Sequence, residues 1–210
     1  MDKLIYQSAK TLVEKIKNRE ISSLELTKLF IKRIEEVNPE INAIVKMNDN
    51  ILEEAKKKDE EVKKNKKLGP LHGLAVTIKD SIDTAGIVTT GGTKGRENYI
   101  PNKDATVVKR LKDAGAIILA KTNTPELTLE YETKNEIYGT SNNPYDIKRS
   151  PGGSSGGAAA AVASGCSPLD IGSDTAGSIR LPAHFCGISG MKPSYGRVPG
   201  TGSIIPHNSG

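Results

Sequence analysis

The sequence contains no tryptophan, only two phenylalanines and only two cysteines among 210 residues. A stacking platform for single-stranded nucleic acid needs aromatic side chains among basic ones, and none is found here. Two cysteines, Cys166 and Cys186, are too few for a disulfide framework and favour a reducing compartment. The longest apolar run, residues 158–163, is far below the roughly 18 residues of a membrane span, and residues 1–6 carry no apolar signal segment. These absences predict a soluble cytoplasmic protein that does not enter a membrane.

The composition is that of a globular protein, with 36% hydrophobic and 26% charged residues. Because aromatics are scarce, the core must be built from isoleucine, valine, leucine and alanine. The formal net charge is +5, and much of the excess lysine lies in residues 56–67, interleaved with acidic residues. Mixed charges at helical spacing favour a solvated helix face; an RNA-binding patch is the less favoured interpretation.

Residues 1–67 have a helical pattern. Ser22 and Glu25 have the spacing of a capping box, and the apolar residues that follow recur at helical spacing. Pro39 is predicted to end this helix. A short strand is expected over residues 41–47, and a charged surface helix over residues 51–67.

The pattern changes after residue 70 to that of an α/β layered domain. Residues 74–78 and 116–120 are short apolar runs, typical of strands buried on both faces. Residues 106–114 form an amphipathic helix between them. Further on, the chain is rich in glycine, serine and alanine. There we expect a helix over 158–163, a strand ending at Ile171, and a helix opening at Ser178.

The glycine loop at residues 152–157 admits two functional interpretations that we disfavour, phosphate binding and a serine nucleophile. It lacks the lysine that a phosphate-binding loop requires after its last glycine. It also matches the G-x-S-x-G motif of a nucleophile elbow, a sharp turn between a strand and a helix, with Ser155 as the nucleophile. Such an elbow must follow a strand directly, whereas Pro151, which blocks strand pairing, precedes this one. The later histidines, His184 and His207, stand in no recognisable setting.

A second glycine-serine cluster spans residues 172–180. Ser178 lies there at a turn, after backbone amides that could form an anion-binding nest, although a serine in this position is usually only a helix cap. Lys79 ends the apolar run 74–78. A lysine in that place either reaches the surface or stays buried with a lowered pKa, which would make it a base for a serine nucleophile. Ser189 and Lys192 form a rival pair, but the intervening and following residues disfavour the helix they need.

The sequence resembles the amidase signature family over residues 8–210. The likeness is carried by a long combined motif: SPGGSSGG at 150–157, GSDTAGSIR at 172–180, LPAHFCG at 181–187, GMKPSYGRV at 190–198, VTIKD at 76–80 and NNPY at 142–145. A motif of this length is highly specific. It therefore adds strong support to the catalytic interpretation of Lys79 and Ser178.

The resemblance implies an α/β fold with a mixed β-sheet core, helices on both faces and a helical N-terminal region. It implies a triad of Ser178 as nucleophile, Ser154 as bridging serine after a cis peptide bond, and Lys79 as base. The implied oxyanion hole comes from the backbone amides of residues 175–178, supported by neighbouring side chains. Those residues are Thr175, Ala176, Gly177 and Ser178 for the hole, and Ser173, Asp174 and Arg180 for its support.

The implied activity is hydrolysis of a small-molecule amide to an acid and ammonia or an amine, with no metal or other cofactor. The alternative is the A subunit of glutamyl-tRNA(Gln) amidotransferase, which works with tRNA and with partner subunits. Residues 38–43 resemble that A subunit, as they do many amidases, whereas residues 181–185 look more like stand-alone amidases. The resemblance leaves room for a homodimer.

Two features depart from the family pattern. Ala176 stands where the family often has glycine. Family members are also much longer. We therefore expect one amidase-like domain, residues 1–210, with a helical region 1–67 and a catalytic α/β core 68–210 that is incomplete at its C-terminus. An inactive or non-catalytic fragment is accordingly a third hypothesis, and residues 1–210 alone are expected to be inactive and only marginally stable.

Overall fold

The computed structural model describes residues 3–64 and 66–204. The α-helices within these residues are α1 (Ala9–Lys17), α2 (Ser23–Ile41), α3 (Ile51–Lys63), α4 (Thr106–Asp113), α5 (Gly156–Ala163) and α6 (Arg180–Phe185). The strands are β1 (Ile44–Met47), β2 (Ala75–Lys79), β3 (Ile117–Thr122), β4 (Lys134–Asn135), β5 (Gly139–Thr140) and β6 (Asp170–Ile171). Short 3₁₀ turns lie at Lys3–Tyr6, Lys94–Arg96 and Glu126–Thr128.

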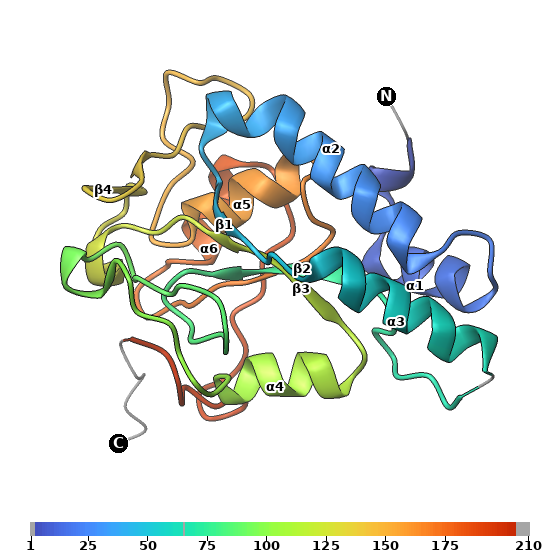
Figure 1. The fold of residues 1–210 in the computed structure, drawn as a ribbon. Coiled ribbons are helices and arrows are strands. Elements are labelled where there is room, and N and C mark those ends of the chain that lie inside the picture. Colours follow the sequence, from blue (N-terminus) through green and yellow to red (C-terminus); the bar gives the residue numbers. More distant parts are fainter. Residues whose placement is uncertain (1–2, 65, 205–210) are drawn as a thin grey trace.

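The central sheet has the strand order β1-β3-β2-β6. Strand β2 is parallel to both β3 and β6, whereas β1 is antiparallel to β3. Every residue of β2 and β3 is buried. Helices α2 and α5 lie on one side of the sheet and α4 on the other (Figure 1). The predicted mixed sheet with helices on both faces is confirmed, and β2 is buried on each side.

Helix α2 begins at the predicted capping box. Ser22 Oγ accepts a hydrogen bond from the Glu25 amide, and the Glu25 carboxylate accepts one from the Ser22 amide. The prediction that Pro39 ends this helix is wrong, because the helix runs on to Ile41. Proline removes one N–H and crowds the carbonyl four residues earlier, but here the burial of Ile41 and the following cap keep the last turn helical. Asn42 then ends the helix with a φ of +45°.

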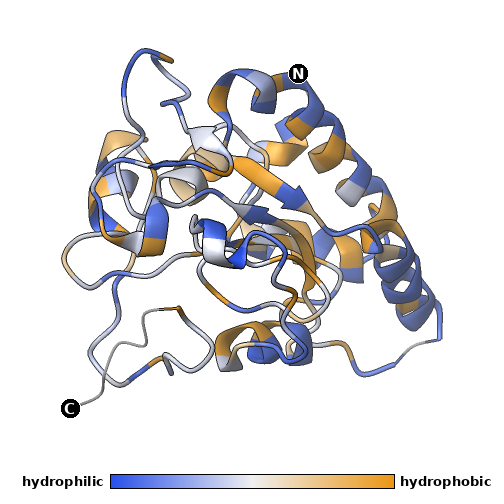
Figure 2. Ribbon diagram, turned by 60° about the vertical axis from the view of Figure 1, so that its left-hand side comes forward, coloured by the Kyte–Doolittle hydropathy of each residue, from blue (hydrophilic) through white to orange (hydrophobic). Residues whose placement is uncertain are grey.

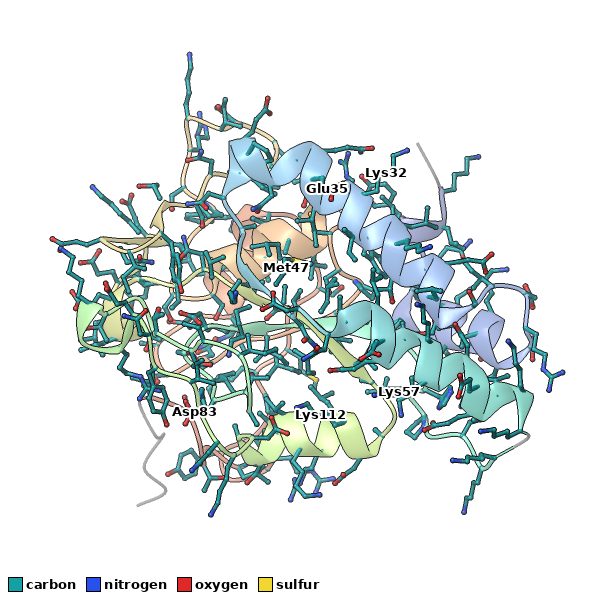
Figure 3. All side chains as sticks on the ribbon, in the orientation of Figure 1. Lys32, Glu35, Met47, Lys57, Asp83 and Lys112 are labelled. Carbon is teal, nitrogen blue, oxygen red and sulfur yellow. The ribbon has the colours of Figure 1, made fainter. Side chains whose placement is uncertain are left out.

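Helix α3 pairs a buried stripe with a charged surface. Figure 2 shows α1–α3 striped with apolar and polar residues, and the exposed side chains include Lys32, Glu35 and Lys57 (Figure 3). The Asp59 carboxylate accepts hydrogen bonds from the first amides of α2, which fixes one helix to the other. The helix ends at Lys63, short of the predicted residue 67, and Arg19 donates to the Val62 carbonyl near this end.

Helix α5 approaches the end of β3 very closely. A Cβ on Gly157 would lie 2.4 Å from the backbone nitrogen of Asn123 and 2.6 Å from its oxygen. The two segments can therefore be this close only because residue 157 has no side chain. This contact sets the glycine loop before α5 against the carboxyl ends of β2 and β3.

Candidate active site

Lys79 is the last residue of β2, and its side chain is fully buried. Its Nζ lies 2.6 Å from Ser154 Oγ, 3.0 Å from Ser173 Oγ and 3.1 Å from Ser155 Oγ. The prediction that Lys79 stays buried within hydrogen-bond reach of Ser154 is confirmed. The amine is therefore held by hydroxyl groups rather than by an ion pair.

The surroundings of Lys79 disfavour its charged form. Burial lowers the pKa of this amine to about 7, although the negative charges of Asp170 and Asp174 oppose the shift. An ordinary lysine has a pKa near 10.4. A large part of the Lys79 population is therefore neutral near pH 7 and able to accept a proton.

Ser154 follows a cis peptide bond from Gly153, as the family resemblance implies. The loop fits tightly here, because a Cβ on Gly153 would lie 2.7 Å from the carbonyl oxygen of Glu130. The Ser154 carbonyl accepts a hydrogen bond of 3.0 Å from the hydroxyl of Thr124. These contacts place the Ser154 hydroxyl beside Lys79 at the base of the site.

Asp174 organises the turn that carries Ser178. Its carboxylate accepts hydrogen bonds from the amides of Gly177, Ile179 and Arg180, at 2.8, 3.1 and 3.2 Å. The Arg180 guanidinium adds two more, at 2.9 and 3.0 Å. Burial opposes ionisation of Asp174, but the hydrogen bonds from Arg180 and the amides outweigh it and hold the pKa of this carboxyl well below its usual range.

Two details of this turn differ from the sequence-based expectations. Helix α6 begins at Arg180 rather than at Ser178, because the amides of Gly177, Ile179 and Arg180 donate to the Asp174 carboxylate and form a turn there. The Gly177 amide, one of the predicted oxyanion donors, is committed to Asp174. The other predicted donors are the amides of Thr175, Ala176 and Ser178.

A pocket of about 210 Å³ lies over these groups. It is lined by residues 128–131 together with Ser154, Ser173, Thr175, Ala176 and Ser178. The pocket therefore brings Ser178 and Ser154 to one surface. Among the residues that the structure describes, no hydrogen bond joins their two hydroxyls.

The disfavoured nucleophiles lie elsewhere. Ser155 is buried and does not line this pocket; its hydroxyl is directed to Lys79 and the Ser173 carbonyl. Ser189 and Lys192 are exposed and lie outside any helix. His184 is exposed on α6, and His207 lies outside the described residues.

The sequence reasoning did not identify a second buried lysine beside the first. Lys121 is in β3, next to β2, and is fully buried. Its Nζ donates hydrogen bonds to the Ile82 carbonyl and to the hydroxyls of Thr84 and Thr89. Burial lowers its pKa to about 8, with Asp80 the largest opposing charge. The signal was present, since Lys121 follows an apolar run just as Lys79 does.

Between residues 3 and 204, Asn65 apart, no group of three histidine, cysteine or acidic side chains is arranged to hold a metal ion. Within the same residues, no helix combines the length and the apolar character needed to cross a membrane.

Comparison with known proteins places these features in a family. The family model described as Amidase matches residues 25–209. The A subunit of the glutamyl-tRNA(Gln) amidotransferase of Carboxydothermus hydrogenoformans is 49% identical over 96% of this chain and 42% of its own length. The corresponding protein of Thermus thermophilus is 45% identical over 88% of this chain and 38% of its own length. The chain thus spans about 40% of the length of these curated relatives.

Solved structures agree with the sequence relatives. The native peptide amidase of Stenotrophomonas maltophilia matches with a TM-score of 0.91 at 35% identity, over 95% of this chain and 42% of that one. A fatty acid amide hydrolase matches with a TM-score of 0.82 at 32% identity, over 86% and 32%. Sequence, fold and site thus lead to the same conclusion: this chain belongs to the amidase family.

Proposed function

We propose that the protein containing this chain hydrolyses the carbon–nitrogen bond of a linear carboxylic amide, giving a carboxylic acid and ammonia or an amine. Ser178 is the nucleophile, Ser154 the bridging hydroxyl and Lys79 the base. The backbone amides of Thr175, Ala176 and Ser178 stabilise the oxyanion, and the hydrogen bonds of Asp174 hold their turn in place.

The proposed reaction has two stages. Ser154 transfers its proton to neutral Lys79 and takes the proton of Ser178, whose oxygen attacks the amide carbon. The tetrahedral oxyanion collapses as the same proton path, reversed, protonates the departing nitrogen, and an ester of Ser178 remains. Water then attacks this ester along the same path, releasing the acid and restoring Ser178. Each oxyanion donor in comparable sites lowers such a barrier by about 3 kcal/mol.

One observation carries the proposal: a fully buried lysine contacts Ser154 at 2.6 Å beneath a pocket that Ser178 also lines. Burial keeps the amine able to accept a proton, and Ser154 lies between it and the pocket. A purely structural role for Lys79 is disfavoured, because burying an ammonium group among three hydroxyls and without an ion pair is costly.

A second candidate is the amidotransferase function itself. The curated relatives named above are A subunits of glutamyl-tRNA(Gln) amidotransferases at 45–49% identity, higher than the 32–35% of the solved amidases named with them. In that case the same chemistry would release ammonia from glutamine for partner subunits that act on charged tRNA. The stand-alone activity is preferred because residues 181–185 read LPAHF, a sequence more like that of stand-alone amidases.

The decisive experiment isolates the full-length protein from its own cells at native abundance. Stand-alone function predicts ammonia release from simple amides by the isolated protein, with a cytoplasmic location and no tRNA-binding partner. The amidotransferase function predicts co-purification with such a partner and release of ammonia from glutamine. No ammonia from any amide, with an intact fold, would contradict both and support a non-catalytic role.

A further inference from the structure

Asp170 lies on the same face of the sheet as Lys79. In the parallel ladder Asp170 pairs with Thr77, and Thr77 and Lys79 are two positions apart on β2, so their side chains share one face. Thr122 of β3 pairs with Lys79 on the other side. The hydroxyl of Thr122 donates a hydrogen bond of 3.0 Å to Asp170 Oδ2, so this side chain reaches back across β2.

The carboxylate of Asp170 is poorly satisfied by hydrogen bonds. Its Oδ1 is buried and has no hydrogen-bond partner among the described residues, although charged oxygens in protein interiors are normally paired. No lysine or arginine nitrogen in the described part of the chain forms an ion pair with it. Burial raises the pKa of Asp170 to about 6, against the hydrogen bonds of Thr77 and Thr122 and the charges of the two lysines.

Few other charges act on this carboxylate. Helix α5, which packs on β2 and β6, consists of glycine, alanine and valine and brings no titratable side chain. Strand β3 contributes the charge of Lys121, but the Ile82 carbonyl holds that amine on the opposite face of the sheet. The turn after β6 contributes the charge of Asp174. Lys79 is therefore the titratable group that shares with Asp170 the face covered by α5. Asp170 and Asp174 are the two carboxylates whose charges act on Lys79.

We infer that Asp170 is a positioning residue for Lys79: its carboxylate, held by Thr122, stabilises the protonated amine and sets the lowest pH at which the site is active. The inference rests on the proposed function, in which neutral Lys79 is the base. A negative charge near the amine favours its protonated form, so removing that charge favours the neutral form at lower pH. Asp170 thus opposes the lowering of the Lys79 pKa by burial and so limits activity at acidic pH.

The test measures the rate at which a fluorophosphonate probe labels Ser178 in the full-length protein as a function of pH. In Asp170→Asn the acid limb of this profile, where the rate falls as pH falls, is expected to move down by about one pH unit, as for the loss of a nearby opposite charge. Labelling on that limb would become about tenfold faster. The two profiles should converge below about pH 6, where Asp170 of the unaltered protein takes up its own proton.

Matched variants separate this effect from a structural one. Asp113→Asn on α4 removes an exposed acid of a surface ion pair and should leave the profile unchanged. Asp170→Glu should restore the original limb. Thr122→Val keeps the carboxyl but removes its hydrogen bond, so it should move the limb down by less than Asp170→Asn; it also serves if Asp170→Asn does not fold.

Two results would overturn the inference. An acid limb that stays in place or moves up in Asp170→Asn and Thr122→Val, while Lys79→Ala abolishes labelling, overturns the role of Asp170 and leaves the proposed function intact. Undiminished labelling of Lys79→Ala would overturn the proposed function, and the role of Asp170 with it.

Discussion

The guanidinium of Arg180 donates two hydrogen bonds to the carboxylate of Asp174, six residues earlier, and so closes the turn that carries Ser178. The partners are unequal, because the Arg180 side chain is 57% exposed and that of Asp174 is fully buried. Most of the organising effect therefore lies with Asp174, which also accepts three backbone amides of the same turn.

Asp174→Asn is expected to destabilise the protein by about 2 kcal/mol, since one neutral oxygen cannot replace a carboxylate that accepts five hydrogen bonds. Activity should fall about a hundredfold, the size of the loss when one oxyanion donor is removed. Urea unfolding and kcat/KM on one amide measure the two effects. Arg180→Gln, which keeps the Asp174 carboxylate, should lose less stability and less activity than Asp174→Asn. Equal losses in the two variants would contradict the larger role given to Asp174.

The difference in unfolding free energy between the protein and Asp174→Asn should also depend on pH. The folded-state pKa of Asp174 lies below its unfolded value, so its contribution is present above about pH 4, the unfolded value, and is lost as pH falls toward the folded value. The gap in unfolding free energy between the protein and Asp174→Asn should therefore shrink below about pH 4. A gap that stays constant down to about pH 2 would show that the carboxylate charge contributes nothing.

Activity should follow the protonation of Lys79. With a pKa of about 7 and a neutral amine as the active form, kcat/KM should fall about tenfold per pH unit below pH 7 and level off above it. Lys79→Ala should lower kcat/KM by about 10²–10⁴ while a cooperative thermal melt is kept. Lys10→Ala, at an exposed position of α1, is the control. A flat profile between about pH 5 and pH 8 would point to another base.

A fluorophosphonate probe should modify Ser178 rather than Ser155, because Ser178 lines the pocket and Ser155 does not. Ser178→Ala should abolish labelling, as mass spectrometry of the digested protein would reveal. Ser155→Ala should still be labelled, although more slowly, since Ser155 contacts Lys79 at 3.1 Å. A probe adduct on Ser155 would revive the elbow interpretation of the glycine loop.

Gly157→Ala should damage both stability and activity. Its new Cβ would lie 2.4 Å from the backbone of Asn123, so α5 or the end of β3 must shift, at a cost of about 1–3 kcal/mol. Gly95→Ala is the matched control, because a Cβ there meets nothing within 4 Å. Thermal melts of the two variants compare the positions directly. Equal melting temperatures would mean that the close approach is not required.

Much of the fold was predictable from local patterns. The strand runs at 74–78 and 116–120 fall within one or two residues of β2 and β3, since continuous apolar runs mark strands buried on both faces. The capping box of Ser22 and Glu25 formed as its spacing predicts. The start of β1 was predicted too early, because α2 runs on to Ile41 and the Asn38 side chain then accepts hydrogen bonds from the amides of Ala43 and Ile44.

The site was predictable in its residues and less so in its geometry. The motif pointed to Lys79 and Ser154, and the position of Lys79 after an apolar run predicted its burial. The hydrogen bond from the Gly177 amide to Asp174 could not be predicted, because the reach of this carboxylate is a property of the folded turn. Asp170 was missed because nothing near it in sequence reveals that it pairs beside Thr77, far earlier in the chain.

The contacts of Lys79 also give the protein an order of assembly. Its hydroxyl partners at Ser154 and Ser173 lie 75 and 94 residues further along the chain. On the ribosome, β2 is therefore made long before its amine has anything to contact, and in water that amine is an ordinary cation. The pKa of the amine falls only when the late segments close over it and bury it. Under the proposed function, a nascent or misfolded chain would carry Ser178 without its base, so amide cleavage would be confined to molecules in which these contacts have formed.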